Sequence, residues 1–243
     1  MVEEKVIYIY DDDIGSVSLV DCMGSDITVV NSARVSFGIE KNELDERDRK
    51  LIRYLIRHRH TSTLEHNLIT FKFCVPLFVR SQHHRHRTWS YNEISRRYTS
   101  KDMKFYLPKA FRTQHKSNRQ ASNSELINPD IPDREFGFYK PATMTANEAV
   151  IQHQVTSSAL FNDLLKAGVC REQARMVLPQ NLYTEYYGTV NLNNLLKFID
   201  LRTHEGAQWE IQKVAEACLE LATDLFPVTV NAYREIRHEV RST

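Results

Sequence analysis

Residues 68–87 read LITFKFCVPLFVRSQHHRHR and carry the clearest structural signal in the chain. Apolar side chains occupy every second position of the first half, which predicts a β-strand with one buried face. These apolar side chains are Ile69, Phe71, Phe73 and Val75. Pro76 ends the strand and suits the first turn of a helix. The stretch therefore predicts a strand followed directly by a helix over residues 76–87, on which Gln82, Arg85 and His86 would share one face.

Two short strands and two helices are expected before this stretch. Residues 6–10 and 17–23 have the composition of strands and enclose an acidic turn. Ser25 is suited to cap a short helix that follows it. A longer helix should begin at Asn42, because apolar residues recur at helical spacing within LIRYLI.

Helices dominate the C-terminal half. Thr145 and Glu148 form the pattern of a capping box, and the long helix that they begin should stop at Gly168. The later elements are a short helix over 171–178, a strand over 182–190, a helix capped by Asn191 and a last long helix over 207–226. Because strands are concentrated early and helices late, this order favours an α+β fold. No break in composition divides the chain, so residues 1–243 are expected to form a single domain.

Residues 112–141 differ from the rest of the chain. They read RTQHKSNRQASNSELINPDIPDREFGFYKP, which is polar, contains prolines and has few large aliphatic side chains. The composition predicts a long polar loop. Long loops inside compact domains commonly serve as lids or binding segments.

The composition excludes several classes of protein. Hydrophobic residues make up 42% and aromatic residues 10%, enough to build a sizeable core. The net charge of +1, with 32 basic and 31 acidic residues, argues against a general nucleic-acid or membrane binder. The N-terminus is acidic and lacks the pattern of a signal peptide, and no apolar run reaches membrane-spanning length. The four cysteines are far apart and form no C-x-x-C pair. We therefore expect a soluble cytoplasmic protein with free thiols.

Residues 85–98, RHRTWSYNEISRRY, gather basic and hydrogen-bonding side chains in a chain of almost neutral charge. The basic residues are mainly arginine, and the planar fork of a guanidinium suits two-point recognition of phosphate or carboxylate. Between them lie side chains that donate and accept in fixed directions, namely Ser90, Asn92, Glu93 and Ser95. The stretch predicts a site for an anionic small molecule that carries a polar ring.

The same stretch has other interpretations. A run of charges is often only an exposed basic face. The nearby histidines alternate with arginines instead of carboxylates or thiolates, so no metal site is expected. Stacking of nucleic-acid bases on Trp89, Tyr91 and Tyr98 stays open as an alternative of a different class, although the charge balance disfavours it. Arg175 and Arg202 lie near the ends of predicted helices, and spacing alone does not join them to the stretch.

The order of short motifs resembles one known family. Arg85, His86 and Arg87, followed after seven residues by Ser95, match the R-H-R-x7-S signature of the flavin-dependent thymidylate synthases. The further matches are S-x-N-E-x-S-x-R-Y over 90–98, ARVSF over 33–37, HTSTLEH over 60–66, ARMVLPQNLYT over 174–184, and LRT with AQWEIQ within 201–212. The resemblance covers nearly the whole chain outside residues 112–141.

The resemblance implies a reaction and an assembly. Members of this family methylate dUMP to dTMP reductively, with 5,10-methylenetetrahydrofolate as the carbon donor. FAD, itself reduced by NADPH, carries the hydride. The family fold is an α+β domain in which helices flank an antiparallel β-sheet. It forms a homotetramer whose active sites lie between subunits.

Matched positions also imply the residues of the site. The residues expected to bind dUMP are Gln82, Arg85, Glu93, Ser95, Arg96, Arg97, Arg175 and Arg202. The residues expected to bind FAD are Ser62, Glu65, Arg85, His86, Arg87, Glu93, Asn191, Asn193 and Lys197. Arg202 is the expected catalytic residue, because a cation at the uracil edge stabilises the N3 anion and makes C5 more nucleophilic. The resemblance implies no metal and no nucleophilic cysteine.

Overall fold

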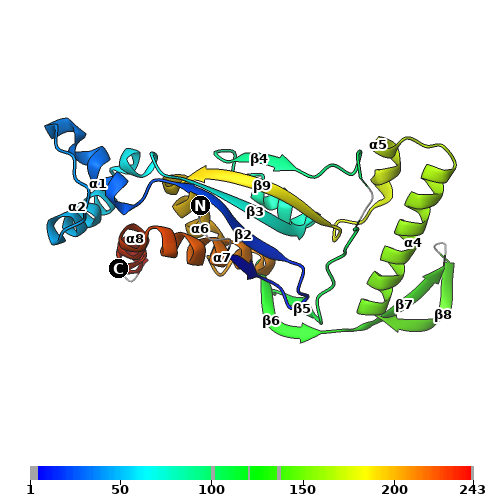
Figure 1. The fold of residues 1–243 in the computed structure, drawn as a ribbon. Coiled ribbons are helices and arrows are strands. Elements are labelled where there is room, and N and C mark those ends of the chain that lie inside the picture. Colours follow the sequence, from blue (N-terminus) through cyan, green and yellow to red (C-terminus); the bar gives the residue numbers. More distant parts are fainter. Residues whose placement is uncertain (1–4, 100–101, 120, 136–137, 242–243) are drawn as a thin grey trace.

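A five-stranded antiparallel sheet lies at the centre of the computed structural model, which describes residues 5–99, 102–119, 121–135 and 138–241. The strands, in sheet order, are β1 (Val6–Tyr8), β2 (Ser16–Met23), β3 (Leu68–Pro76), β9 (Tyr183–Asn191) and β4 (Ser90–Glu93). Every neighbouring pair is antiparallel. Figure 1 shows helices along one face of this sheet and at both of its ends, so the α+β prediction with an antiparallel sheet is confirmed.

The remaining elements surround this sheet. The helical elements are α1 (Asp26–Arg34), η1 (Val35–Phe37), α2 (Glu46–Arg57), η2 (Thr61–Leu64), α3 (Leu77–His83), α4 (Ala146–Lys166), α5 (Arg171–Ala174), η3 (Arg175–Val177), α6 (Leu192–Arg202), α7 (Trp209–Leu225) and α8 (Pro227–Arg241). The outer strands are β5 (Phe111–Gln114), β6 (Ser122–Ile127), β7 (Asp130–Glu135) and β8 (Phe138–Thr145).

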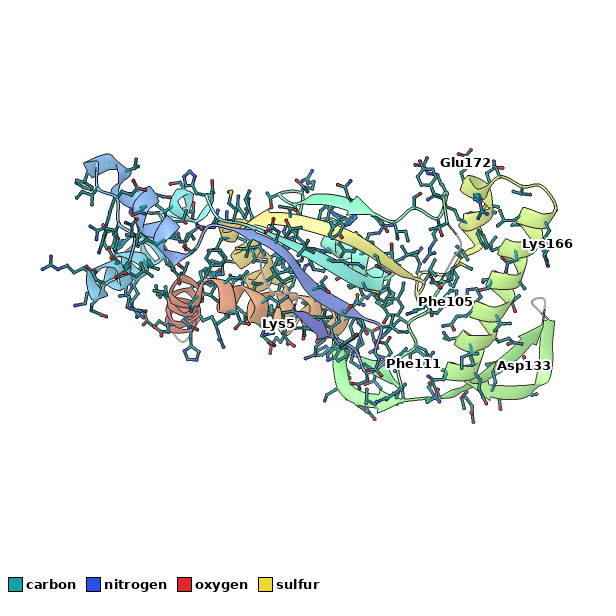
Figure 2. The ribbon with its side chains drawn as sticks, viewed as in Figure 1. Lys5, Phe105, Phe111, Asp133, Lys166 and Glu172 are labelled. Atoms are coloured by element: carbon teal, nitrogen blue, oxygen red, sulfur yellow. The ribbon has the colours of Figure 1, made fainter. Side chains whose placement is uncertain are left out.

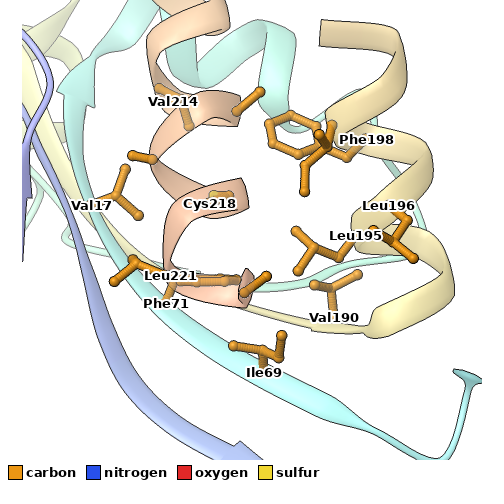
Figure 3. Packing of buried hydrophobic residues seen from close by; sticks show 14 of the residues in the cluster. Val17, Ile69, Phe71, Val190, Leu195, Leu196, Phe198, Val214, Cys218 and Leu221 are labelled. Carbon is orange, nitrogen blue, oxygen red and sulfur yellow. The ribbon is translucent and has the colours of Figure 1, made fainter. Parts of the chain in front are cut away.

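The main core lies between the sheet and helices α6 and α7. The alternating apolar side chains of β3 are all fully buried on this face, as the sequence predicts. Figure 3 shows Ile69 and Phe71 of the sheet facing Cys218 and Leu221 of α7, with Leu195 of α6 beside them. The close packing of this layer fixes the positions at which α3 and α6 end, and those two ends carry predicted site residues.

A smaller core attaches α4 to the rest of the molecule. Phe161 of α4 is fully buried against Leu178 and Leu182, and Phe105 packs on the same cluster. Figure 2 shows Phe105 between the sheet and α4, with Lys166 and Glu172 near the far end of that helix. This cluster holds α5 and η3 beside the end of the sheet.

The N-terminal cap of α2 differs from the prediction. Asp45 caps the helix instead of Asn42, and its carboxylate accepts hydrogen bonds from the backbone of Arg47 at 2.8 Å and of Asp48 at 2.9 Å. The buried Asp48 carboxylate in turn accepts from the backbone of Asp45 and pairs with Arg34 at 2.5 Å. A carboxylate with this reciprocal partner forms a stronger cap than the isolated amide of Asn42.

Helix α3 is shorter than expected and ends at His83. Its last residue is fully buried, and its Nδ1 lies 2.8 Å from the hydroxyl of Tyr186. The chain then continues in tight turns, in which the backbone of Arg85 bonds to Gln82 and that of His86 to His83. Gln82, Arg85 and His86 therefore do not share a helical face, and the prediction that they do is wrong.

The prediction of a long polar loop over residues 112–141 is also wrong. Antiparallel pairs β5–β6 and β7–β8 form most of this segment, with Phe111 opposite Ile127 and Asp130 opposite Thr145. Positions 120, 136 and 137 lie outside the described residues. Most side chains of β6 are exposed, so no alternation of apolar residues marks the strand. Backbone pairing without a buried face leaves little trace in a sequence.

The sequence also did not predict α8, because the last helix was expected to end at Phe226. A second helix begins directly at Pro227 and buries Val230 and Ile236. Its first turn is held by Asp26, whose carboxylate accepts from the backbone of Val228 and Thr229 at 2.9 Å each. The capping residue lies about 200 positions earlier in the chain, so local patterns around Pro227 give no cap signal.

The capping box of α4 is present and leads to a stability prediction. The hydroxyl of Thr145 accepts from the backbone of Glu148, whose carboxylate accepts from the backbone of Thr145 at 2.8 Å. We expect Thr145→Ala to lower the free energy of unfolding by about 1 kcal/mol. Denaturant unfolding measures the change. Thr156→Ala in the middle of the same helix is the control, because its exposed hydroxyl bonds only to the preceding turn. Equal stability of the two variants would contradict the cap.

Candidate functional site

A cavity of about 640 Å³ lies between the end of β4, the start of β9 and the α5–η3 turn. We call it the arginine cleft, after the predicted site residues that line it. They are Glu93, Ser95, Arg96, Arg97 and Arg175. The fold therefore brings Arg175 close to the basic stretch, and spacing in the sequence alone does not predict this proximity. Five of the eight residues predicted to bind dUMP share this cavity.

The carboxylate of Glu93 is held in a fixed position at the wall of the arginine cleft. Oε1 accepts a hydrogen bond from the hydroxyl of Thr184 at 2.7 Å and lies 3.2 Å from Nε of Arg80. The pairing of β4 with β9 places Glu93 opposite Tyr186. A carboxylate has two oxygens, so Oε2 is available to accept from a ligand.

The two exposed arginines of the cleft have few internal partners. Arg97 lies over the ring of Tyr98, with 5.3 Å from the guanidinium carbon to the ring centroid. Nε of Arg175 donates to the backbone carbonyl of Glu172 at 3.4 Å. Neither guanidinium pairs with a carboxylate within the described ranges. Both can therefore bind an anion without breaking an ion pair.

Ser95 and Arg96 form the turn that follows β4. The Ser95 hydroxyl accepts from the backbone of Arg97 at 3.3 Å, and the Ser95 carbonyl accepts from that of Tyr98 at 2.9 Å. The guanidinium of the half-buried Arg96 donates to the carbonyl of Tyr183 at 3.4 Å, and burial lowers its pKa. The side chain of Arg96 thus binds the protein backbone, and its main chain is the part that fits the expected nucleotide contact.

Arg202 and His86 contact each other outside the arginine cleft. Nε of Arg202, the last residue of α6, donates to Nε2 of His86 at 3.0 Å. Burial, and then the charge of Arg202, lower the pKa of His86 to about 4. The imidazole is therefore neutral near pH 7, with Nε2 as the acceptor and the proton on Nδ1. The ring also packs edge-on against Phe198, which fixes its orientation.

Gln82 lies in the last turn of α3. Its side-chain amide donates a hydrogen bond to Oε1 of Gln208, which precedes α7. We call His86 and Arg202 the Arg202 group. Neither of these two residues, nor Gln82, lines the arginine cleft. Gln208 lies in a matched motif, but sequence reasoning gave it no role, because its contact with Gln82 spans 126 positions.

Some of the residues predicted to bind FAD lie close to one another. Nδ2 of the buried Asn193 donates to Oε1 of Glu65 at 2.8 Å. Asn193 and Lys197 line a cavity of about 460 Å³ beside Thr61, the residue before Ser62. Glu65, Lys197 and Ser62 are exposed.

The other predicted FAD contacts stand apart from that cavity. The side chain of Asn191 caps α6 by accepting from the backbone of Asn194 at 2.9 Å. Arg85 and Arg87 are exposed on the turns after α3. Their positions on either side of His86 leave both guanidiniums available to an external anion. The structure therefore does not bring all the predicted FAD contacts into one cavity of a single chain.

The neutral state of His86 gives a pH prediction. The unfolded chain takes up this proton near the usual value of 6.5, whereas the folded chain does so only near a pKa of about 4. Acid therefore favours the unfolded state, and stability should fall as the pH is lowered through this window. We expect His86→Gln, which keeps an acceptor but cannot be protonated, to lose less stability between pH 7 and pH 4. Denaturant unfolding at several pH values tests this, and identical pH slopes would contradict it.

The described residues offer neither a metal cluster nor a membrane span. They contain no group of three or more His, Cys, Asp or Glu side chains placed to hold a metal ion. Within the described ranges, no helix has both the length and the apolar composition that crossing a membrane requires.

Comparisons with known proteins agree with the fold and with the family that the sequence resembles. Residues 18–228 match the family model described as thymidylate synthase complementing protein. A flavin-dependent thymidylate synthase of Thermus thermophilus is 43% identical over 225 residues, which cover 92% of this chain and 77% of that protein. The enzyme of the same name from Thermotoga neapolitana is 41% identical, with 91% of each chain covered.

Among solved structures, a similar one is the UMP/dUMP methylase PolB from Streptomyces cacaoi bound with 5-Br dUMP. It has a TM-score of 0.75 and 33% sequence identity, and 94% of this chain and 97% of that chain are covered. The extent of these matches, together with the ordered motifs, shows that the chain belongs to the flavin-dependent thymidylate synthase family.

Proposed function

We propose that this chain methylates dUMP reductively to dTMP, with 5,10-methylenetetrahydrofolate as the carbon donor and FAD, reduced by NADPH, as the hydride carrier. The observation that carries the proposal is the arginine cleft, in which Arg97 and Arg175 meet from segments far apart in the sequence. The identity of 43% to a flavin-dependent thymidylate synthase supports the same reaction class.

The arginine cleft would hold the nucleotide phosphate. Arg97 and Arg175 supply charge and paired donors, and the Ser95 hydroxyl lies beside the backbone of Arg97. The main-chain amide of Arg96 would add a further donor to a bound dianion. Oε2 of Glu93 would accept from a hydroxyl group or N–H group of a bound ligand. The remaining predicted dUMP contacts are Gln82, Arg85 and Arg202, which lie outside the cleft.

Arg202 would act on the uracil ring. Because Nε of Arg202 is bound to the neutral His86, the outer guanidinium nitrogens are oriented and available. A fixed cation at the uracil edge would stabilise negative charge on N3 and raise the electron density at C5. C5 would then attack the methylene carbon of the folate, while a bond from that carbon to a folate nitrogen breaks and the nitrogen keeps the electron pair. Burial raises the pKa of Cys22, Cys74 and Cys218, so these thiols stay protonated, as a mechanism without a cysteine nucleophile requires.

The predicted FAD contacts fit an anionic, hydrogen-bonding cofactor. Arg85, Arg87 and Lys197 offer exposed cations for a pyrophosphate. Asn193 and Glu65 form a preorganised polar pair. Further contacts are proposed for Ser62, His86, Glu93 and Asn191. When bound, FAD supplies the hydride that completes the methyl group.

The proposed site needs more than one copy of the chain. Arg202 and His86 are not among the described residues that line the arginine cleft, yet one nucleotide must meet both places. We propose a homotetramer in which the cleft of one protomer faces the Arg202 group of its partner.

Spectroscopy and turnover test the proposal. The purified protein should be yellow from bound oxidised flavin, and dUMP should stimulate NADPH oxidation with formation of dTMP from the folate donor. UMP is the informative second substrate, because a solved relative is described as a UMP/dUMP methylase. A colourless protein that binds oligonucleotides in a strongly salt-dependent manner would instead favour a nucleic-acid binder.

A further inference from the structure

Glu210, in the first turn of α7, is a buried carboxylate with three side-chain partners. It is 4% exposed. Oε1 pairs with the guanidinium of Arg112 at 2.6 Å and accepts from the hydroxyl of Tyr106 at 3.3 Å, while Oε2 accepts from Nε2 of Gln208 at 2.8 Å. Arg112 comes from β5 and also lies over the Trp209 ring, 5.0 Å from its centroid. Glu210 therefore joins the β5–β6 hairpin to the start of α7.

The carboxylate fixes the direction of a chain of amides. A carboxylate paired with a guanidinium can only accept hydrogen bonds, so Gln208 must turn its NH₂ group toward Glu210. The carbonyl oxygen of Gln208 then faces the other way and accepts from Gln82. Gln82 must therefore donate with Nε2, and its own carbonyl oxygen is left to accept. Each amide in the series has one orientation that satisfies its neighbour.

We propose that Glu210 and Gln208 are positioning residues, which orient the Gln82 amide so that its carbonyl oxygen accepts a hydrogen bond from the nucleotide. The inference rests on the proposed function, which makes Gln82 a contact of dUMP. Apart from its phosphate, dUMP binds with two donors, the 3′-hydroxyl and the N3–H of the neutral uracil, which is present before negative charge develops on N3. An amide turned the opposite way would place a donor against a donor. The hydrogen-bonded series Glu210, Gln208 and Gln82, which we call the relay, therefore selects for a donor at this point of the ligand.

A pair of variants isolates the relay. Gln208→Met removes the amide at similar length, and it removes no helix cap, because the Gln208 side chain makes no capping hydrogen bond. Gln82→Met removes the proposed contact itself. We expect each change to raise the Kd for dUMP about tenfold, which is the size of one hydrogen bond. The double variant should also be weakened about tenfold and not about a hundredfold, because Gln208 acts only through Gln82.

Gln212→Met is the matched control on the same helix. Its amide donates to the carbonyls of His204 at 3.1 Å and Ala207 at 2.7 Å and does not contact Gln82. Its Kd for dUMP should equal that of the wild type. If Gln208→Met fails to fold, Gln208→Asn is used, since its shorter side chain cannot span both neighbours and should give the same change.

Two analogues identify the donor. 2′,3′-Dideoxyuridine monophosphate lacks the 3′-hydroxyl, and N3-methyl-dUMP lacks the N3–H. Gln82→Met should leave the Kd unchanged for the analogue that lacks the relevant donor, while still weakening the other. Failure of the wild-type protein to bind dUMP would refute the proposed function. Normal binding by Gln208→Met, or effects that multiply in the double variant, would refute the relay alone.

Discussion

Arg202→Ala is expected to lower turnover with dUMP by about 10²–10³-fold, while the folded structure persists. The reason is that Arg202 supplies the cation that stabilises negative charge on uracil as the carbon–carbon bond forms, and loss of one preorganised donor typically has an effect of this size. Its side chain is half-buried at the end of α6 and its hydrogen bond is to His86, so removal opens no cavity in the core. Single-turnover rates at saturating dUMP measure the chemical step without the contribution of binding.

Two further variants sharpen this test. Arg202→Lys keeps the charge but not the planar fork, so its rate should lie between those of the wild type and Arg202→Ala. Arg53→Ala removes an exposed ion pair with Glu235 and should leave the rate unchanged. Turnover of Arg202→Ala close to the wild-type rate would show that the assigned role is wrong.

Arg97→Ala is expected to weaken dUMP binding by roughly 10- to 150-fold, which corresponds to roughly 1.5–3 kcal/mol for hydrogen bonds to a charged group. Arg97 is exposed at the arginine cleft and pairs with no carboxylate within the described part of the chain, so its guanidinium is available to the phosphate. Equilibrium titration at constant ionic strength gives the Kd.

Deoxyuridine, which lacks the phosphate, is the control ligand for Arg97. If Arg97 binds the phosphate, the variant and the wild type should bind deoxyuridine equally weakly. An unchanged Kd for dUMP, or an equal loss of affinity for the nucleoside, would contradict the proposed phosphate contact.

The sequence predicted elements whose pattern is created by burial. The alternation in β3 and the apolar stripe of α7 reflect two surfaces that meet in one core, so each can be read without knowledge of the other. The outer strand β6 is exposed at all but one position and left no such pattern. Helix α8 was missed because Asp26, which caps it, is distant in the sequence.

The site was predictable only as a set of residues. The resemblance named Arg97, Arg175 and Arg202 as contacts of one nucleotide, but the sequence does not show that Arg97 and Arg175 line one cavity of a single chain while Arg202 lies outside it. The joining of Arg175 to the basic stretch depends on the packing of α4 and α5 against the end of the sheet. Glu210 belongs to a matched motif, yet its partner Arg112 lies 98 positions away in a segment expected to be a loop. Chemistry that depends on such contacts cannot be read from local spacing.

The position of β9 between β3 and β4 has a consequence for biosynthesis. While a ribosome is still making the first 180 or so residues, one edge of β3 has no neighbour, and the hydrogen-bonding groups of a largely apolar strand stay open. Strand β4 cannot join the sheet in this period, because β9 is its only partner in the described sheet order. The nascent chain therefore depends on rapid completion, or on chaperones, to avoid self-association through this edge.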